Sequence, residues 1–551
     1  MAEGLHLSPR HREKIEALVR AHLPDVEVWA YGSRVNGRSH DGSDLDMVLR
    51  GPKLAEIDAS RLAEFTEALH NSTIPFLVEA RDWTRLPERF HREIERHHVV
   101  LVTGGDRRLA GQRSGVGSEW REVRLGDLID IKHGFAFKGH CIHDEPRGDV
   151  LLTPGNFDMG GGFKGDKFKY YDGSVPKEFV LREGDLLVTM TDLSKQSDTL
   201  GYPAFVPACT DSRRYLHNQR LGKVSLNETA KVDTRYIYYV MCGIEYRHEV
   251  LASATGTTVK HTSPDRIKRF RFPLPPLPEQ RAIAHILGTL DDKIELNRRM
   301  NETLEAMARA LFKSWFVDFD PVRAKMEGRD TGLPKEIADL FPARLVDSEL
   351  GEIPEGWEVA TVGDHIVNFD AKRIPVSGTV RAERRGSYPY HGAAGVLDHV
   401  DDYIFDGVFL LLGEDGSVMR ENGLAVTQYV WGKFWVNNHA HVLQGAGPVS
   451  TEQAYLHFSF EPVAPLVTGA VQPKLSQNRM NCVPFVFAGE GICRAFTRVV
   501  QPWFARLRSC AEETKILAAL RDALLPRLVS GELRVGELES LIYGQDARPR
   551  S

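Results

Sequence analysis

Three acidic residues and one glycine–serine pair near the N-terminus have the types and spacing that nucleotide chemistry requires. Gly32 and Ser33 follow an apolar run, and Asp44 and Asp46 come shortly after them. Side chains two residues apart on a strand point to the same face, so Asp44 and Asp46 would present two carboxylates together. Mg²⁺ that bridges nucleotide phosphates is the usual way to relieve such crowding. Glu79, in a later apolar run, is the expected third acid.

The surrounding residues predict the elements that would hold these groups. An apolar run that ends at a glycine predicts a strand followed by a turn into a short helix. Gly32 and Ser33 would then lie at a helix N-terminus, where unsatisfied N–H groups and the helix dipole favour phosphate oxygens. In chain order we expect a helix at residues 11–21, strands at 26–31, 44–49 and 75–83, and a helix at 90–94.

These stretches resemble the minimal nucleotidyltransferase family of the polymerase-beta type, small domains that pair with a separate protein in toxin–antitoxin modules. The resemblance covers residues 1–104 and rests on GSRVNG at 32–37, SDLD at 43–46 and PFLVEARDW at 75–83. It implies that Gly32 and Ser33 hold the phosphates of a nucleoside triphosphate. It also implies that Asp44, Asp46 and Glu79 bind Mg²⁺ and activate the attacking hydroxyl.

Glu79 departs from the family, in which the third acid is commonly Asp, by one methylene group. Two interpretations of the domain therefore stay open. It is either a working nucleotidyltransferase or a retained fold that only binds a toxin-like protein partner. Residues 105–118 are rich in Gly, Arg and Ser and lack apolar periodicity, which predicts a flexible linker between independently folding units.

The run from Glu279 to Val317 predicts one long helix that needs a partner helix. Its apolar positions alternate steps of four and three residues, the heptad seam of a coiled coil. Asn297 and Asn301 interrupt the seam, where a buried amide usually selects the pairing register. The same spacing recurs near the C-terminus, where Arg521 is a poor core residue and a slip of register to Leu520 stays open. The two seams are Ile283, Leu287, Leu290, Ile294, Asn297, Asn301, Leu304, Ala308, Leu311 and Trp315, and Trp503, Leu507, Cys510, Thr514, Leu517, Arg521, Leu524 and Leu528.

The sequences that lead into the two helices also match, which indicates an internal duplication at domain scale. A Trp is followed six residues later by Gly-Asp in both copies, at 120–127 and at 357–364. The copies end with matching residues at a constant separation of 213 positions, as from Thr255 to Thr468. Between these anchors the two globules have little in common, as two recognition modules with different targets would. The matching ends are Thr255-Gly256 and Thr468-Gly469, Ser263 and Ser476, Arg266 and Arg479, Ile267 and Met480, Phe270 and Val483, and Phe272 and Phe485.

Residues 119–535 resemble the specificity subunit of type I restriction–modification systems, most closely at 272–328, 350–359 and 520–535. The resemblance implies two target recognition domains that each bind half of a bipartite site on double-stranded DNA. It further implies that two long antiparallel helices set the gap and dock methyltransferase subunits, two being expected, together with restriction subunits. S-adenosylmethionine would be bound by the methyltransferase, and we expect no cofactor in this region.

The expected fold is an α/β multidomain chain with a nucleotidyltransferase domain and two mixed α/β target recognition domains separated by the antiparallel coiled-coil helices. The expected boundaries are 1–104 for the nucleotidyltransferase-like domain, 105–118 for the linker, 119–276 for the first target recognition domain, 277–327 for the first spacer helix, 328–490 for the second target recognition domain, 491–535 for the second spacer helix and 536–551 for a tail.

Base contacts are expected from the divergent globules and phosphate contacts from cations on their rims. Arg266 and Arg479 occupy equivalent repeat positions, so a role in supporting the fold stays open for them. For Asn218 and Asn438 a turn role and a base-contacting role stay open. The DNA-binding candidates, chosen from local charge, are Arg213, Arg214, Lys260, His261, Lys268 and Arg269 in the first globule, and Lys372, Arg373, Arg384, Arg385, Lys474 and Arg479 in the second.

Composition limits the remaining possibilities. The net charge of −6 argues that nucleic-acid binding rests on local patches. The six cysteines form no CxxC pair, and His439 with His441 has no evident third ligand, so we expect core or hydrogen-bonding histidines in place of a metal pair. With no apolar run of membrane-spanning length, we expect no membrane association and a cytoplasmic protein.

No methylation motif is evident, so the leading interpretation is a DNA-specificity subunit with a fused nucleotidyltransferase-like domain. The alternative is an active enzyme that transfers a nucleotidyl group to a protein or RNA hydroxyl and is localised by the DNA-binding module.

Overall fold

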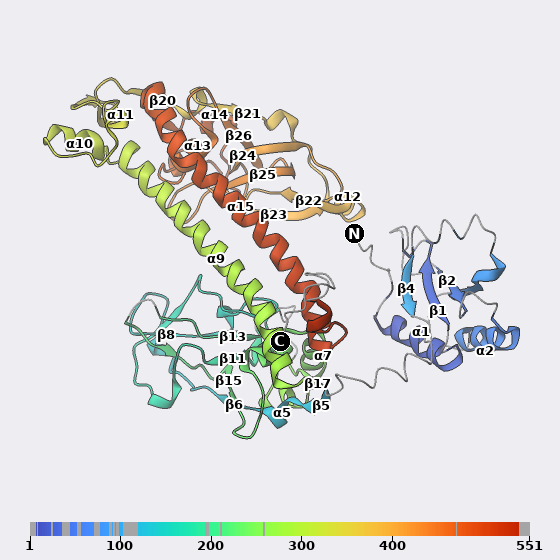
Figure 1. Ribbon diagram of the computed structural model, residues 1–551. Coiled ribbons are helices and arrows are strands. Elements are labelled where there is room, and N and C mark those ends of the chain that lie inside the picture. The colour runs from blue at the N-terminus through green and yellow to red at the C-terminus, as the bar shows by residue number, and fades with distance from the viewer. Residues whose placement is uncertain are drawn as a thin grey trace, which may run out of the picture. The chain divides into compact units, whose positions relative to one another are not determined.

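A computed structural model of the 551-residue chain divides it into two compact units, Met1–Trp120 and Arg121–Ser551 (Figure 1). The described residues are 7, 9–23, 26–32, 34–35, 44–51, 57–70, 78–86, 91, 94, 98–102, 120–192, 198–209, 212–256, 259–469 and 471–538. The predicted linker at 105–118 and most of the predicted tail lie outside them, as does most of the predicted helix at 90–94. None of the helices in the described part of the chain has the length and apolar composition that a membrane span requires.

The N-terminal unit is a mixed sheet with two helices against one face. Its strands follow the order β3-β2-β1-β4, in which β2 and β3 are parallel and the other pairs antiparallel. Leu45, Met47 and Leu49 alternate along β2 toward the helices and share a core with Ile15 and Phe65. The residues between them therefore face the other side of the sheet. The elements are α1 (Pro9–His22), β1 (Glu27–Tyr31), β2 (Leu45–Arg50), α2 (Ala59–His70), β3 (Val78–Asp82) and β4 (Val99–Val102).

Each globule of the second unit contains its own core sheet, and the two core sheets have the same strand arrangement. Strands in the order β13-β11-β15-β6 form it in the first globule, and β25-β24-β26-β21 form it in the second. A helix follows the third strand of each set, and a two-stranded ribbon closes each globule. The elements are β5 (Arg121–Arg124), α5 (Leu125–Leu128), β6 (Ile129–His133), β11 (Leu186–Thr189), β13 (Pro203–Phe205), β15 (Leu221–Leu226), α6 (Thr234–Cys242), α8 (Pro264–Ile267) and β17 (Arg271–Leu274), and then β20 (Glu358–Thr361), β21 (Ile366–Asn368), β24 (Phe405–Gly413), β25 (Thr427–Val436), β26 (Ala440–Gly445), α13 (Thr451–His457), α14 (Gln477–Asn481) and β27 (Pro484–Phe487).

Local geometry repeats where the sequence predicted it. The Asp127 carboxylate accepts the Arg124 N–H at 3.3 Å, and the Asp364 carboxylate accepts the Thr361 N–H at 3.0 Å. The glycine before each Asp has no room for a side chain. A Cβ on Gly126 would lie 2.9 Å from Lys268 Cβ, and one on Gly363 would lie 2.8 Å from Asn481 Cβ. Lys268 and Asn481 are themselves 213 residues apart, so one close packing is built twice.

The globules diverge in what is added to the shared sheet. The first carries a separate five-stranded sheet of order β10-β14-β8-β9-β7, whereas the second extends the shared sheet itself by β22 and β23. The sequence predicted that the two globules have little in common between the matching ends. This is wrong for the core sheet, which both contain, and right for the strands added to it. The added strands are β7 (Ile142–His143), β8 (Asp149–Leu151), β9 (Lys169–Tyr171), β10 (Val180–Leu181), β14 (Tyr215–Leu216), β22 (Arg385–His391) and β23 (Val396–Val400).

The remaining described elements join these parts or lie at their edges. They are η2 (Trp83–Arg85), η3 (Gly139–Cys141), η4 (Pro154–Asn156), η5 (Lys177–Phe179), β12 (Thr191–Asp192), α7 (Ile244–Ser253), β16 (Lys260–His261), α10 (Asp320–Met326), α11 (Lys335–Ala338), β18 (Leu345–Ser348), β19 (Gly351–Pro354), η6 (Val362–Asp364), η7 (Asp370–Lys372), α12 (Gly378–Glu383) and η8 (Ala464–Leu466).

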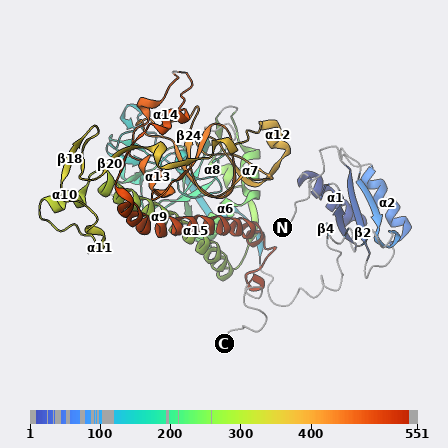
Figure 2. The ribbon, with the colours of Figure 1, turned by 90° about the horizontal axis from the view of Figure 1, so that it is seen from above.

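Two long helices, α9 (Leu277–Phe316) and α15 (Gly489–Ser530), pack along each other as an antiparallel pair. Glu279 pairs with Arg534 beyond the end of α15, while Asn297 contacts Glu513 nearer its middle. Such a pairing requires that the helices run in opposite directions. Both globules lie on the same side of the pair, as Figure 2 shows. The α/β multidomain architecture predicted from the sequence is confirmed, including the antiparallel helices.

Polar residues hold the register of the seam. Asn297 is buried and donates to Glu513 at 2.9 Å. Arg521 stays half-buried in the seam and pairs with Asp291 at 2.9 Å, whereas Leu520 is 45% exposed. The register therefore does not slip to Leu520, because an acid on α9 satisfies the arginine.

Asn301 differs from Asn297 because its buried Oδ1 has no hydrogen-bond partner. An unsatisfied buried acceptor costs about 1–3 kcal/mol. We expect Asn301→Leu to raise the free energy of unfolding of this unit by about 1 kcal/mol, measured by thermal denaturation. The matched variant Asn297→Leu loses the bond to Glu513 and should bring no gain. A lower melting temperature for Asn301→Leu than for the native chain would contradict this account.

Candidate functional site

Gly32 directly follows β1, at the point where the predicted nucleotide site begins. The antiparallel register of β1 and β2 places Tyr31 opposite Asp46. Gly32 has a φ of 81°, and a Cβ on it would lie 2.4 Å from Asp46 Oδ2. Only glycine therefore allows the turn and the approach of the Asp46 carboxylate together. Ser33 lies outside the described residues.

Asp46 and Glu79 lie side by side on the face of the sheet opposite the helices. The parallel register of β2 and β3 pairs them directly. Burial and the Glu79 carboxylate raise the pKa of Asp46 above its ordinary value; Asp44 adds to the effect and Arg81 opposes it. Asp44 is exposed and lies just before β2. In the described part of the chain, these three acids do not form a group whose oxygens all lie within 4.8 Å of one another.

Arg81 belongs to this site and was missed by the sequence reasoning. Its guanidinium pairs with Glu79 at 2.5 Å. That hydrogen bond, with the nearby charges of Tyr31 and Asp46, raises the pKa of Arg81. The spacing of two residues after Glu79 on one strand could have revealed it, because such residues share a face. A cation beside two carboxylates at a glycine turn gives the site a group that can bind phosphate.

The DNA-binding candidates of the first globule fall into two groups. Arg214 bonds to Asp149 through Nε at 3.0 Å, and Lys268 pairs with Asp130 at 3.0 Å. These two cations hold the fold of their own globule. Arg213 lies over the Tyr170 ring at 5.1 Å. Lys260 and His261 form β16, and His261 Nδ1 lies 3.0 Å from the Thr191 hydroxyl.

In the second globule Lys372 is exposed beside the Phe369 ring, and Arg479 donates to the Leu466 carbonyl at 3.4 Å. Its repeat counterpart Arg266 donates to the Thr255 hydroxyl at 3.0 Å. Arg266 therefore bonds to the Thr-Gly segment itself and Arg479 to the residue two positions before its copy, and both bonds favour the fold-supporting role left open for these arginines. Arg384 pairs with Asp401 at 2.8 Å.

His261 and Lys474 occupy equivalent positions in the two globules. Thr255 exchanges backbone hydrogen bonds with His261, and Thr468 does so with Lys474. Both side chains are exposed. The constant separation of 213 residues already linked these two positions, so this equivalence could have been found from the sequence.

Asparagines make the same turn in the two globules, but the second is Asn437 and not Asn438. Asn218 Oδ1 accepts the N–H of Arg220 at 3.0 Å, and Asn437 Oδ1 accepts the N–H of His439 at 2.8 Å. Each side chain thus bonds to the backbone two residues on, as in an Asx-turn. These bonds favour the turn role for Asn218.

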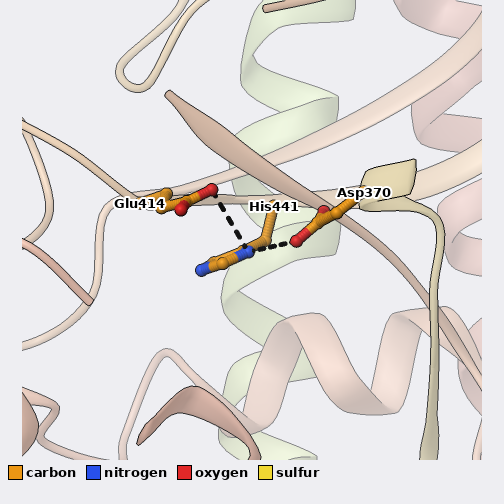
Figure 3. Close-up of side chains that lie close together, drawn as sticks. All are labelled: Asp370, Glu414 and His441. Atoms are coloured by element: carbon orange, nitrogen blue, oxygen red, sulfur yellow. Dashed lines mark hydrogen bonds and ion pairs between the residues drawn. The ribbon is translucent and has the colours of Figure 1, made fainter. Parts of the chain in front are cut away.

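His441 lies at the centre of a buried polar cluster (Figure 3). Its Nδ1 is 2.5 Å from Asp370 and 3.6 Å from Glu414, and its Nε2 donates to the Leu475 carbonyl at 2.8 Å. One proton must lie between Nδ1 and Asp370, because two lone pairs would repel at this distance. The expected hydrogen-bonding role of His441 is confirmed. The expectation that His441 has no further possible ligand nearby was wrong, since Asp370 and Glu414 lie beside it. The sequence did not reveal Asp370 because it is 71 residues away from His441.

Arg373 pairs with both carboxylates of this cluster. Its guanidinium lies 2.7 Å from Glu414 and 3.4 Å from Asp370, and Nη1 also donates to the Ala440 carbonyl. Lys474 adds a second cation 3.6 Å from Glu414. The carboxylates are thus balanced by protein cations. The cluster ties η7, β24 and β26 to the segment that ends at Lys474, and Arg373 is committed to it.

Asp370 gives the cluster a pH-dependent contribution to stability. Burial acts to raise its pKa, but the hydrogen bond and charge of His441 prevail and hold it below the ordinary value. A depressed carboxyl pKa stabilises the fold above the unfolded-state pKa of about 3.9, and the gain is lost as pH falls through the folded-state pKa. Asp370→Asn should therefore cost about 3 kcal/mol at pH 7, and the difference should shrink below about pH 4.

Urea denaturation at several pH values would measure the free energy of unfolding of Asp370→Asn and of a control variant. Asp339→Asn is the matched control, because its pair with Lys335 is exposed and should contribute less than about 0.5 kcal/mol. A stability difference for Asp370→Asn that stays constant down to pH 3 would contradict the assignment.

Comparison with known proteins identifies both units. Residues 117–306 match the family model described as type I restriction modification DNA specificity domain. The MjaIX specificity subunit of Methanocaldococcus jannaschii is 28% identical over 336 residues, which cover 56% of this chain and 71% of that protein. The HindI specificity subunit of Haemophilus influenzae is 42% identical over 249 residues, 43% of this chain and 49% of that protein.

A third relative matches a shorter part of the chain. The Haemophilus influenzae protein named "Probable protein adenylyltransferase MntA" is 31% identical over 87 residues, 16% of this chain and 75% of that protein. The chain therefore belongs to the type I restriction–modification specificity subunits, and it carries at its N-terminus a domain of the nucleotidyltransferase family that includes MntA.

Proposed function

We propose that this subunit binds a bipartite site on double-stranded DNA and positions methyltransferase subunits there. The observation that carries the proposal is the repetition of one globule on the same side of a rigid helix pair. The 40 residues of α9 span about 60 Å, which exceeds one duplex turn of about 34 Å. Helix length would then set the spacing of the two half-sites. Base contacts would come from the strands that the globules do not share.

The candidates for DNA contact are cations at or near equivalent positions of the two globules. His261 and Lys474 are exposed at the same repeat position, Lys260 precedes His261, and Lys372 is exposed at the end of η7. Phosphate contacts of this kind position a protein on DNA without specifying sequence. Lys268 and Arg373 bond to carboxylates of their own globules at 3.0 and 2.7 Å, so they are excluded from this role. Lys474 stays a candidate because it is exposed and its contact with Glu414 is longer, at 3.6 Å.

The side of the helix pair away from the globules is the proposed docking face for methyltransferase subunits. Tyr239 and Tyr455 bond from the globules to Asp291 and Glu305 on α9, which leaves another side of the pair uncovered. Exposed apolar side chains lie along both helices, with Ile516 69% exposed. They are Leu296, Met300, Met307, Ile516 and Leu520. Apolar residues at such spacing on a helix pair suit packing by further helices. Restriction subunits would join through the methyltransferase assembly, whose S-adenosylmethionine is bound outside this chain.

The N-terminal domain supports a second function, nucleotidyl transfer from a nucleoside triphosphate to a hydroxyl of a protein partner. Asp44, Asp46 and Glu79 form a donor set that suits Mg²⁺, which when bound would neutralise phosphate charge and lower the pKa of the attacking hydroxyl. Gly32 lets the Asp46 carboxylate lie against the turn, and Arg81 would hold the transferred phosphate by charge. A toxin-like protein is the proposed acceptor, because MntA is named as a protein adenylyltransferase.

Label transfer from α-labelled nucleoside triphosphates with Mg²⁺ tests the second function. We expect a labelled protein band in lysate of the source cell, reduced at least 100-fold by Asp44→Asn with Asp46→Asn, because both metal-binding carboxylates are lost. Glu16→Gln is the control, since this acid lies on α1 and pairs with Arg12. No label above the double variant with any of the four nucleotides would leave a domain that only binds a partner.

Charge placed on the open side of the helix pair tests the docking face. Ile516→Glu with Leu520→Glu should reduce co-purification of the co-expressed methyltransferase at least tenfold and abolish methylation of the site, because burying the new carboxylates is costly. The melting temperature of the isolated subunit should stay unchanged. Val367→Glu with Val380→Glu is the control, since both valines are exposed on the second globule. Normal assembly of the Ile516 and Leu520 variant would rule out this face.

A further inference from the structure

Val471 has the most exposed large apolar side chain in the described part of the chain, with 99% of its surface accessible to solvent. A valine stabilises a fold when it is removed from water, and Val471 makes no such contribution. A single exposed apolar side chain is common on protein surfaces and by itself indicates nothing. Its meaning depends on the loop that carries it.

Two backbone hydrogen bonds close this loop at its base. The Thr468 N–H donates to the Lys474 carbonyl at 2.9 Å, and the Lys474 N–H donates to the Thr468 carbonyl at 2.7 Å. Gly469 has a φ of 88°, and a Cβ on it would overlap the Gln472 carbonyl oxygen. The loop thus turns tightly at a residue that only glycine allows, and it presents Val471 to solvent.

Further backbone bonds attach the loop to the end of β24. The Gly416 N–H donates to the Pro473 carbonyl, and the Leu475 N–H donates to the Glu414 carbonyl, both at 2.9 Å. Glu414 directly follows β24, so the loop is held at a fixed place beside the core sheet. A loop that is ordered before binding loses little conformational entropy when it contacts a partner.

The first globule builds the same loop at the equivalent position. Thr255 and His261 exchange backbone hydrogen bonds of 2.9 and 2.8 Å, and a Cβ on Gly256 would overlap a carbonyl oxygen of its own loop. In sequence, Thr258 stands 213 residues before Val471, so the shared loop carries different β-branched residues in the two globules. Val471 is too exposed to help attach its globule to the helices, and target binding is the other function that the two globules share.

The charged groups at the base of the loop favour an anionic partner. The side chains of Lys474 and His439 are half-exposed, whereas those of Glu414 and Asp415 are largely buried. Each acid also lies near a cation of its own globule, since Glu414 bonds to Arg373 at 2.7 Å and Asp415 is 3.5 Å from His439. A partner that approaches the tip of the loop therefore meets the lysine before it meets either acid.

We propose that Val471 is a specificity-determining residue that contacts the C5-methyl group of a thymine in the major groove, while Lys474 contacts a neighbouring phosphate. The proposal rests on the DNA binding proposed above, and it adds a base contact at the shared loop to those expected from the added strands. The major groove is about 12 Å wide and admits a two-stranded ribbon, and the thymine methyl is the apolar group exposed there. The phosphate contact positions the loop, and the methyl contact distinguishes thymine from cytosine.

Deoxyuridine tests this contact, because it pairs as thymidine does and lacks only the C5-methyl group. The methylated motif is first identified by sequencing DNA that the full subunit has methylated together with its co-expressed methyltransferase. Each thymine of both half-sites is then replaced by deoxyuridine in turn, and the affinity of the complex is measured by fluorescence anisotropy. We expect one such replacement in one half-site to weaken binding about threefold or more, because less apolar surface is buried.

Val471→Ala should weaken binding to the thymine duplex by a similar factor and abolish the preference for thymine over deoxyuridine at that position. Lys474→Gln should weaken binding to both duplexes equally, because a phosphate contact carries no sequence information. Val367→Ala is the matched control. Val367 is an exposed valine on β21 of the same globule, so its variant should retain the native preference.

Equal affinity for thymine and deoxyuridine at every position would overturn the proposal, as would a Val471→Ala complex that keeps the native preference. Loss of co-purifying methyltransferase from the Val471→Ala subunit would assign the loop to a protein contact and would overturn it as well. A native complex that binds no specific DNA would instead refute the DNA binding on which the proposal rests. The native complex thus separates failure of the loop contact from failure of the proposed function.

Discussion

The antiparallel seam between α9 and α15 is the constraint on which the second unit depends. Each helix begins where one globule ends, so the register of the pair fixes how far apart the globules are held. Apolar heptads alone tolerate slips of a whole heptad, because every step offers similar burial. Asn297 with Glu513 and Arg521 with Asp291 make one register better than the others, since any slip would leave these groups buried without partners. The register selected in this way would also determine the spacing of the two half-sites on DNA.

The core fold common to both globules explains how one attachment to the helices can carry two different recognition surfaces. Its fixed points are backbone features: a carboxylate that caps a turn, a glycine pressed against the facing segment and a self-closing Thr-Gly stretch. None of them depends on the strands added outside the core sheet. A separate sheet in the first globule and an extension of the core sheet in the second are therefore both compatible with the same attachment to the helices. The added strands can therefore differ between the globules, because the features that attach each globule to the helices do not involve them.

Patterns local in sequence predicted much of this architecture. The heptad seams, the Gly-Asp turns and the 213-residue separation each follow from spacing, and the carboxylates on β2 and β3 follow from strand alternation. Contacts between distant segments could not be predicted in the same way. Asp370 reaches His441 across 71 residues, and nothing in either neighbourhood marks the pair.

Glu79 shows how a small departure from a family pattern can be absorbed. An aspartate there would be one methylene shorter and less able to reach a side chain two residues along its own strand. The longer glutamate pairs with Arg81 and so offsets part of the charge that raises the pKa of Asp46. A divalent cation that binds between Asp46 and Glu79 would compete with Arg81 for the same carboxylate. Release of Arg81 would then leave its guanidinium free to contact phosphate, so metal and nucleotide binding would support each other at this site.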